Sequence, residues 1–224
     1  MFSWTDVTDS YTVPQFDHSA LVLIDVQRDF LDGGALPVAG TSERLPRMRM
    51  LVEAFRAAGH PIVHVVRLYD GDDVALLPDL PRRATIAAGA PIVRPGSAGS
   101  QIATELLPAG SPDLDTDLLR SGHLQPLGDG EFAMFKPRWD AFTRTHLDGF
   151  LRSAGVSTVV IAGCNFPNCP RASIYGASNH DFRTLVAADA ISGATAERLA
   201  ELRTLGVPHA ESAEIVAALR GAAP

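Results

Sequence analysis

Cys169 stands where a predicted strand gives way to a predicted helix. The apolar run 159–163 is typical of a buried strand, and a short turn rich in Asn and Pro follows it at 164–168. Pro170 is favoured in the first turn of a helix, where its missing N–H costs no hydrogen bond. The positive end of the helix dipole and the free N–H groups there favour a thiolate, the nucleophilic form of cysteine. The same N–H groups can hold the oxyanion that forms when a thiolate attacks a carbonyl.

Asp25 and Lys136 also follow apolar runs, at 19–24 and 131–135. An acid that ends a buried strand is costly unless it has a partner or a function. Because ligands bind beyond the carboxyl ends of the strands in doubly wound sheets, we expect Asp25, Lys136 and Cys169 to meet in one crevice. A free thiol has a pKa of about 8.5, so Asp25 would accept the thiol proton and Lys136 would stabilise the resulting anion.

The elements that position these residues alternate between strand and helix. Continuous Leu, Val and Ile runs mark strands buried on both faces, as in a parallel sheet. The alternation predicts an α/β fold with a doubly wound, mostly parallel sheet and helices on both faces. We expect strands at 19–27, 61–68, 131–136, 157–163 and 183–188, and helices near 42–58, 102–107, 145–154, 170–179, 194–205 and 212–219.

Two segments have weaker patterns. Residues 1–18 are polar and aromatic without a period, and we interpret them as an N-terminal arm that packs on the domain or on a neighbouring subunit. Residues 69–130 are irregular, and so long a stretch is expected to cover the active-site mouth or to carry subunit contacts. One domain over residues 1–224 is the simplest division of the chain, with two domains as the alternative.

Composition limits the class of function. Hydrophobic residues make up 46% and charged residues 20%, as in ordinary globular proteins, and the net charge of -7 argues against nucleic acid as a partner. No apolar run is long enough to span a bilayer, and the N-terminus lacks the layout of a secretion signal. With two cysteines, Cys164 and Cys169, we expect a cytoplasmic protein with free thiols, since a bridge within one short turn would be strained.

The chain resembles the isochorismatase-like cysteine hydrolases, a superfamily that includes nicotinamidases, N-carbamoylsarcosine amidohydrolases, ureidoacrylate amidohydrolases and maleamate amidohydrolases. Any one matching stretch would be a weak signal, but they occur together in the correct order and spacing. They are LIDVQRDF at 23–30, GSQI at 99–102, EL at 105–106, KPRWDAF at 136–142 and IAGCNFPNC at 161–169. Together they cover the chain from about residue 20 to residue 193.

The resemblance implies a role for each catalytic residue. By it, Cys169 is the nucleophile, Asp25 the general base and acid, and Lys136 the third catalytic member. The backbone N–H groups of Asn165 and Cys169 would form the oxyanion hole, with a cis peptide bond between Cys164 and Asn165 to aim the first of them. Relatives are usually dimers or tetramers, so we expect a homodimer or a homotetramer.

The resemblance also bears on metal binding. Nicotinamidases carry an Asp and two His after the second strand, placed to bind zinc or a similar ion. Residues 67–73 contain no histidine, and the other histidines are scattered without the spacing of a zinc site. We therefore predict no metal and no other cofactor, and expect a substrate other than nicotinamide.

The matching stretches also supply candidates for substrate binding. Arg138 and Arg171 could meet a carboxylate, because a guanidinium group matches its geometry. Phe166 belongs to a turn that is bulkier than is usual in the family, which would reshape the pocket beside the thiol. For the side chains after Lys136, surface and core positions are equally open. The candidate substrate-binding residues are Gln27, Phe30, Arg138, Trp139, Phe142, Phe166 and Arg171.

These observations predict a metal-independent cysteine hydrolase that cleaves a C–N bond of a small amide, ureide or lactam through a thioester. Cleavage of isochorismate is not expected, because the isochorismatases proper lack the cysteine. One alternative is a catalytically silent binding or scaffold protein with the same fold. Another is a hydrolase of a different bond, such as a vinyl ether or a nitrile. Release of ammonia or an amine would support amide cleavage, and no turnover would support the scaffold protein.

Overall fold

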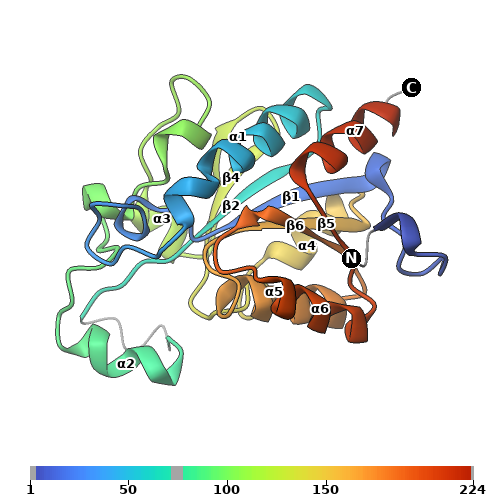
Figure 1. Ribbon diagram of the computed structural model, residues 1–224. Helices are drawn as coiled ribbons and strands as arrows, with labels where there is room; N and C mark the ends of the chain where they lie inside the picture. The colour runs from blue at the N-terminus through green and yellow to red at the C-terminus, as the bar shows by residue number, and fades with distance from the viewer. Residues whose placement is uncertain (1–3, 72–77, 223–224) are drawn as a thin grey trace.

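A seven-stranded sheet forms the middle layer of the computed structural model, which describes residues 4–71 and 78–222 (Figure 1). The strand order is β3-β4-β2-β1-β5-β6-β7, and only the β3–β4 pair is antiparallel. The predicted α/β class with a mostly parallel sheet is confirmed. The strands are β1 (Ser19–Ile24), β2 (Ile62–Val66), β3 (Gln125–Gly128), β4 (Glu131–Phe135), β5 (Thr158–Gly163), β6 (Arg183–Ile191) and β7 (His209–Ala210).

Helices cover both faces of the sheet. Helices α1 and α7 lie side by side on one face, and α4, α5 and α6 lie on the other, while α2 stands apart from both layers (Figure 1). No helix among residues 4–71 and 78–222 combines the length and apolar character needed to cross a membrane. The helices are α1 (Thr41–Ala57), α2 (Leu80–Ala87), α3 (Thr116–Arg120), α4 (Leu147–Ser153), α5 (Cys169–Asn179), α6 (Ala196–Leu202) and α7 (Ser212–Ala222).

The strands that the sequence predicts most clearly are the ones buried by both helix layers. Every residue of β1, β2 and β5 is buried, which explains why these strands are continuous apolar runs with no alternation. Helices α1, α5 and α7 also begin and end within a few residues of their predicted bounds. The expected helix near 102–107 is a single 3-10 turn, Thr104–Leu106.

Four elements were missed by the sequence analysis. Strand β3 contains Pro126 and Gly128, which are poor strand residues, and it is tolerated as a short antiparallel edge strand. Helices α2 and α3 are short, and β7 has two residues. The stretch 69–130 therefore contains three short regular elements, α2, α3 and β3, although residues 72–77 lie outside the described part.

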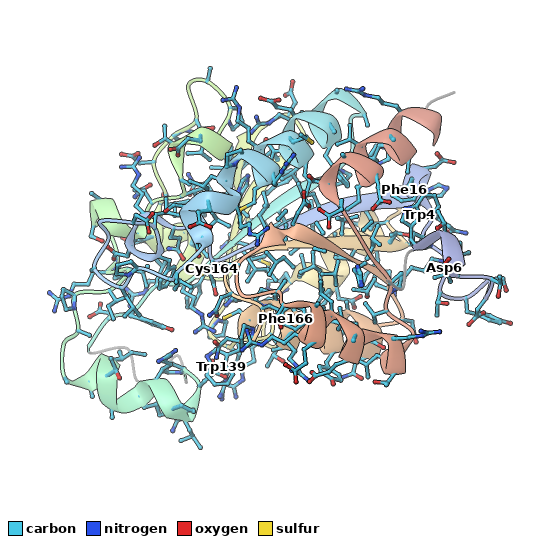
Figure 2. All side chains as sticks on the ribbon, in the orientation of Figure 1. Trp4, Asp6, Phe16, Trp139, Cys164 and Phe166 are labelled. Carbon is cyan, nitrogen blue, oxygen red and sulfur yellow. The ribbon has the colours of Figure 1, made fainter. Side chains whose placement is uncertain are left out.

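The N-terminal arm packs against its own chain. The ring of Trp4 meets that of Phe16 edge to face at 5.1 Å, and the amide of Gln15 donates to Thr158 Oγ1 over 2.9 Å. Arg183 also donates to the carbonyl oxygen of Ser10 over 3.1 Å. Trp4 and Phe16 lie at the opposite end of the molecule from α2 (Figure 2). Of the two places considered for the arm, the structure supports the packing on its own domain.

Strands β1 and β5 lie at the point where the strand order reverses, and Gly163 lets them approach closely there. A Cβ atom on Gly163 would lie 2.2 Å from the carbonyl oxygen of Ile24, and its φ of +121° is unfavourable for any other residue. The amide of Cys164 donates to the same oxygen over 2.8 Å. The segments that carry Asp25 and Cys169 therefore leave the sheet from adjacent points, where doubly wound sheets bind ligands.

A buried ionic cluster joins α1 to the sheet. Glu131, at the start of β4, accepts hydrogen bonds from Arg56 Nε over 2.7 Å and from Arg56 Nη2 over 2.8 Å. His64 Nε2 lies 2.7 Å from the same carboxylate. Burial alone would raise the pKa of Glu131, but the hydrogen bonds from His64 and Arg56 outweigh it and lower this pKa.

Replacing Glu131 by glutamine is expected to lower the free energy of unfolding at pH 7 by about 1–3 kcal/mol. Because its pKa is lowered in the folded state, Glu131 stabilises the protein above the ordinary value of 4.5, and this contribution is lost as the pH falls below it. Urea unfolding at several pH values should show the difference from the wild type shrinking in acid. Glu53→Gln, on the exposed face of α1, is the matched control and should change little. An equal loss at every pH would contradict the assignment.

Candidate active site

Asp25 follows β1 and is held by a buried ion pair. Its Oδ2 atom accepts a hydrogen bond from Lys136 Nζ over 2.9 Å, and Lys136, just after β4, is fully buried. Asp25 has a φ of +54°, a left-handed conformation that costs energy for a residue with a side chain and occurs often at functional sites. Its second oxygen, Oδ1, is buried without a hydrogen-bond partner among the described residues. This oxygen is available to accept a proton.

Cys169 is the first residue of α5 and is buried beside Asp25. Burial raises the pKa of the Cys169 thiol, and the negative charge of Asp25 raises it further, whereas Lys136 and Arg67 lower it only in part. The resting group is therefore a thiol next to a carboxylate. Burial and the adjacent acid therefore outweigh the helix N-terminus, which by itself favours the thiolate. The thiol needs Asp25 to take its proton.

Arg67 is a charged residue of this site that the sequence analysis did not assign. It follows β2, and its Nη2 atom lies 3.3 Å from Cys169 Sγ while its Nε atom lies 3.3 Å from Asp25 Oδ2. Burial would lower the pKa of Arg67, but its interactions with Cys169 and Asp25 outweigh this effect, so the pKa is raised well above the ordinary value and Arg67 stays charged. Arg67 also donates to the hydroxyl of Tyr69 over 2.8 Å. The sequence did contain a signal for Arg67, because this residue ends an apolar strand just as Asp25 does.

Gln27 fixes the backbone of Arg67. Its Oε1 atom accepts the Arg67 amide over 2.7 Å, and its Nε2 atom donates to the Arg67 carbonyl over 2.8 Å and to the Ser100 carbonyl over 2.7 Å. Gln27 is fully buried. It therefore acts on the site through Arg67, and it does not line the cavity described below.

Two amides at the turn before α5, of residues that line the cavity, have no carbonyl partner among the described residues. Among the described residues, neither the amide of Asn165 nor that of Cys169 donates a hydrogen bond to a carbonyl, although both residues line the cavity. By contrast, the amide of Phe166 donates to the Ser192 carbonyl over 2.8 Å, and that of Asn168 donates to the Asn165 carbonyl over 3.1 Å. Two free donors beside a thiol are the arrangement that an oxyanion needs.

The peptide bond between Cys164 and Asn165 is trans, as are the other peptide bonds among residues 4–71 and 78–222. The cis bond that the resemblance implies is therefore wrong for this structure. Backbone hydrogen bonds hold both sides of the bond in its trans form, from the Cys164 amide to the Ile24 carbonyl and from the Phe166 amide to the Ser192 carbonyl, each 2.8 Å long.

Asp25, Arg67 and Cys169 line a cavity of about 210 Å³, and Lys136 is not among its lining residues. Helix α2 forms part of its wall, and Trp139 and Cys164 lie on the side of the molecule that faces this helix (Figure 2). The volume suits a small molecule rather than a polymer. The lining residues are Asp25, Phe30, Leu36, Val38, Arg67, Tyr69, Arg82, Thr85, Ile86, Ala90, Ile92, Trp139, Cys164, Asn165, Asn168 and Cys169.

The structure divides the predicted substrate-binding residues into two groups. Phe30 and Trp139 line the cavity. Phe142 and Phe166 are buried in the hydrophobic core, and Arg171 pairs with Glu201 over 2.6 Å at the surface. Arg138 is half-buried, and its carbonyl oxygen accepts a hydrogen bond from Lys136 Nζ over 3.3 Å. Gln27, Arg138, Phe142, Phe166 and Arg171 are not among the cavity-lining residues.

Cys164 is the second thiol of the cavity, and both cysteines are free. Burial raises the pKa of Cys164 to about 12, so this thiol is not ionised at neutral pH. No group of three or more His, Cys, Asp and Glu side chains suited to a metal ion occurs within the described part of the chain. Cys169, with its carboxylate and two cations, is the cysteine equipped for nucleophilic chemistry.

Comparison with known proteins agrees with this geometry. A sequence model of the isochorismatase domain matches residues 19–117 and 109–207. A relative from Arabidopsis thaliana named "probable inactive nicotinamidase" is 30% identical over 85% of this chain and 90% of its own length. The ureidoacrylate amidohydrolase of Methylobacterium radiotolerans is 29% identical over 80% of this chain and 69% of its own.

The fold has solved counterparts as well. The crystal structure of an isochorismatase family protein from Desulfovibrio vulgaris superposes with a TM-score of 0.75 at 27% identity, covering 91% of this chain and 98% of the other. The domain match spans most of the chain, and the seven-stranded, mostly parallel sheet is consistent with it. The chain belongs to the isochorismatase family.

Proposed function

We propose that the protein is a metal-independent cysteine hydrolase that cleaves a C–N bond of a small amide, ureide or lactam. The observation that carries the proposal is the placement of Cys169 Sγ 3.3 Å from Arg67 beside Asp25, which Lys136 binds over 2.9 Å. These groups supply a nucleophile, a base and fixed positive charge in one small cavity. Relatives that include a ureidoacrylate amidohydrolase support the choice of a C–N bond.

In the first half of the reaction, Asp25 accepts the thiol proton as Cys169 Sγ forms a bond to the substrate's carbonyl carbon. The carbonyl oxygen becomes an oxyanion, which the amides of Asn165 and Cys169 bind. When the intermediate collapses, the C–N bond breaks and Asp25 returns its proton to the departing nitrogen. Ammonia or an amine leaves, and the acyl group stays on Cys169 as a thioester.

In the second half, a water molecule takes the place of the leaving group. Asp25 removes a proton from the water, whose oxygen bonds to the thioester carbonyl carbon. The C–S bond then breaks, the proton passes from Asp25 to sulfur, and a carboxylic acid leaves. Lys136 holds Asp25 in position throughout, and Arg67 stabilises the sulfur whenever it carries negative charge.

The positive charges around Asp25 support a reaction that does not use a metal ion. Arg67 directly follows strand β2, and the Nε atom of its guanidinium group lies 3.3 Å from Asp25 Oδ2. With the Lys136 ammonium group on the same oxygen, Asp25 is already neutralised by two cations. A divalent ion would be repelled by both.

A catalytically silent protein is the second candidate, because a relative that is 30% identical carries the name "probable inactive nicotinamidase". That name concerns nicotinamide, which is not the substrate expected here. The buried charges at this site favour catalysis over silence, since three ionised side chains around a thiol are costly to keep without a function.

Ammonia release from a panel of small amides, ureides and lactams tests the proposal. Purified protein, a chelator-treated sample and Cys169→Ala are assayed in parallel, with Cys164→Ala as the matched control for the second thiol. Turnover that survives the chelator and Cys164→Ala but disappears in Cys169→Ala is expected. Turnover that needs added metal, or that survives in Cys169→Ala, would overturn the mechanism. No release from any compound would favour the silent protein.

A further inference from the structure

Arg82 places a positive charge in the cavity wall that the proposed reaction does not use. It lies in the first turn of α2, and its side chain lines the cavity that also holds Asp25 and Cys169. The amide of Arg82 donates to the Asp79 carbonyl over 2.8 Å. Its guanidinium group makes no ion pair or side-chain hydrogen bond with any described residue, and the group is half-buried.

The unpaired state of Arg82 contrasts with that of the other charged groups in the cavity. Arg67 is bound to Asp25 and Cys169 and lies 3.5 Å from Asp79 Oδ2. The neighbouring Arg83 points elsewhere, donating to the Pro78 carbonyl over 3.2 Å. Among residues 4–71 and 78–222, no acidic side chain forms an ion pair with Arg82.

The position of Arg82 also disfavours a lone cation. A positive charge in the first turn of a helix is destabilised by the helix dipole, which favours anions at that end. An anion bound in the cavity beside Arg82 would be attracted both by the guanidinium group and by the positive end of the helix dipole. Because a guanidinium group matches a carboxylate with two parallel hydrogen bonds, a carboxylate is the anion that fits best.

The rest of the cavity wall near α2 is apolar. Ile86 lies one turn after Arg82 on the same helix, and Tyr69, Ile92 and Trp139 contribute further apolar surface. These side chains suit the hydrocarbon body of a substrate. A molecule that extends from Cys169 along this wall would bring a group at its far end to Arg82.

We propose that Arg82 selects substrates that carry a free carboxylate at the end remote from the scissile amide. This inference rests on the proposed function for its substrate class, but the carboxylate site itself can be tested without turnover. It differs from the sequence-based candidates Arg138 and Arg171, neither of which lines the cavity.

Protection of Cys169 against iodoacetamide provides the first test. Succinate, glutarate and adipate are each compared with the monocarboxylate of the same carbon number, since one carboxylate can enter the catalytic end and a second can reach Arg82. At least one dicarboxylate is expected to protect at about tenfold lower concentration than its partner, a typical effect of one charged hydrogen bond. Arg82→Gln should abolish this advantage, and the adjacent Arg83→Gln, which removes the same charge from the same turn, should keep it.

Turnover provides the second test and separates this inference from the proposed function. The monoamides of the same three diacids are assayed against butyramide, pentanamide and hexanamide. Arg82→Gln is expected to lower kcat/KM for the acidic amides by about 10- to 100-fold relative to the neutral amides of the same length, chiefly through KM.

The outcomes have distinct meanings. Dicarboxylate protection that depends on Arg82, with no ammonia release from any amide, would keep the carboxylate site and refute the hydrolase. Hydrolysis of neutral and acidic amides that is equally unaffected by Arg82→Gln would keep the hydrolase and refute the site. Equal protection by dicarboxylates and monocarboxylates in the wild type would also refute it.

Discussion

Asp25→Asn is expected to lower amide hydrolysis by about 10³- to 10⁴-fold, near the upper end for loss of an acid–base group. Asparagine has nearly the same shape and can still face Lys136, but it cannot accept the proton of the buried Cys169 thiol. Both halves of the proposed reaction route a proton through this carboxylate. Steady-state ammonia release measures the loss, and Asp148→Asn, a half-exposed acid on α4, is the control for removal of a charge.

The same substitution is expected to change the reactivity of Cys169 in the opposite direction. Burial and the charge of Asp25 both raise the pKa of Cys169, so removal of that charge should lower the pKa, because Lys136 and Arg67 are then opposed by burial alone. A lower pKa means more thiolate at pH 7. Alkylation by iodoacetamide, followed by mass spectrometry of the Cys169 peptide from pH 6 to 9.5, should therefore be faster at pH 7 than in the wild type.

Slower hydrolysis together with faster alkylation of Cys169 would show that Asp25 acts as a base and does not merely support the fold. A variant that had merely unfolded would alkylate Cys164 and Cys169 alike and would lose its cooperative thermal transition. Hydrolysis that stays within tenfold of the wild type, or slower alkylation of Cys169 in a folded variant, would contradict the role given to Asp25.

The meeting of Asp25, Lys136 and Cys169 in one place was predictable from sequence, because the two charged residues share a simple signature. Asp25 and Lys136 are charged residues that end apolar strands, and parallel strands bring such ends to one edge of the sheet. Arg67 has the same signature after β2, but the sequence analysis considered that segment only for metal ligands. Applied uniformly, the rule that found Asp25 would have found Arg67.

The cavity wall was less predictable, because side chains in one motif can point in different directions. Trp139 reaches the cavity, whereas Phe142, in the same stretch, stacks on His180 at 5.3 Å and packs into the core. Nothing in the spacing of the two residues distinguishes them, since the loop after β4 has neither helical nor strand period.

Helix α2 shows a second limit of sequence analysis. It has eight residues and lies in a stretch of weak pattern, so its contribution to the cavity depends on contacts with residues far away in the chain. Arg82 could be read as a solvated surface charge from sequence alone. The role proposed for Arg82 depends on its place in the cavity wall, which only the structure shows.

Arg67→Gln is expected to lower kcat/KM by about 10²- to 10³-fold, the usual effect of removing one preorganised donor from a buried site. Arg67 is the one described side chain that donates to both Cys169 and Asp25, over 3.3 Å in each case. Arg67→Lys should restore little of the loss, because a single ammonium group cannot reach Cys169, Asp25 and Tyr69 at once. Arg49→Gln, on the exposed face of α1, is the control and should match the wild type.

The pH dependence of alkylation gives Arg67 a signature of its own. Arg67 lowers the pKa of Cys169, so its removal should raise that pKa and shift iodoacetamide alkylation to higher pH, opposite in sign to Asp25→Asn. If Arg67 had only a structural role, Arg67→Gln would lower the stability of the protein but would not shift the alkylation profile in the direction opposite to Asp25→Asn. Because the two substitutions act on one thiol from opposite charges, the double variant should have an alkylation profile between those of the single variants. A profile that moves in the same direction in Asp25→Asn and Arg67→Gln would refute the electrostatic account of the site.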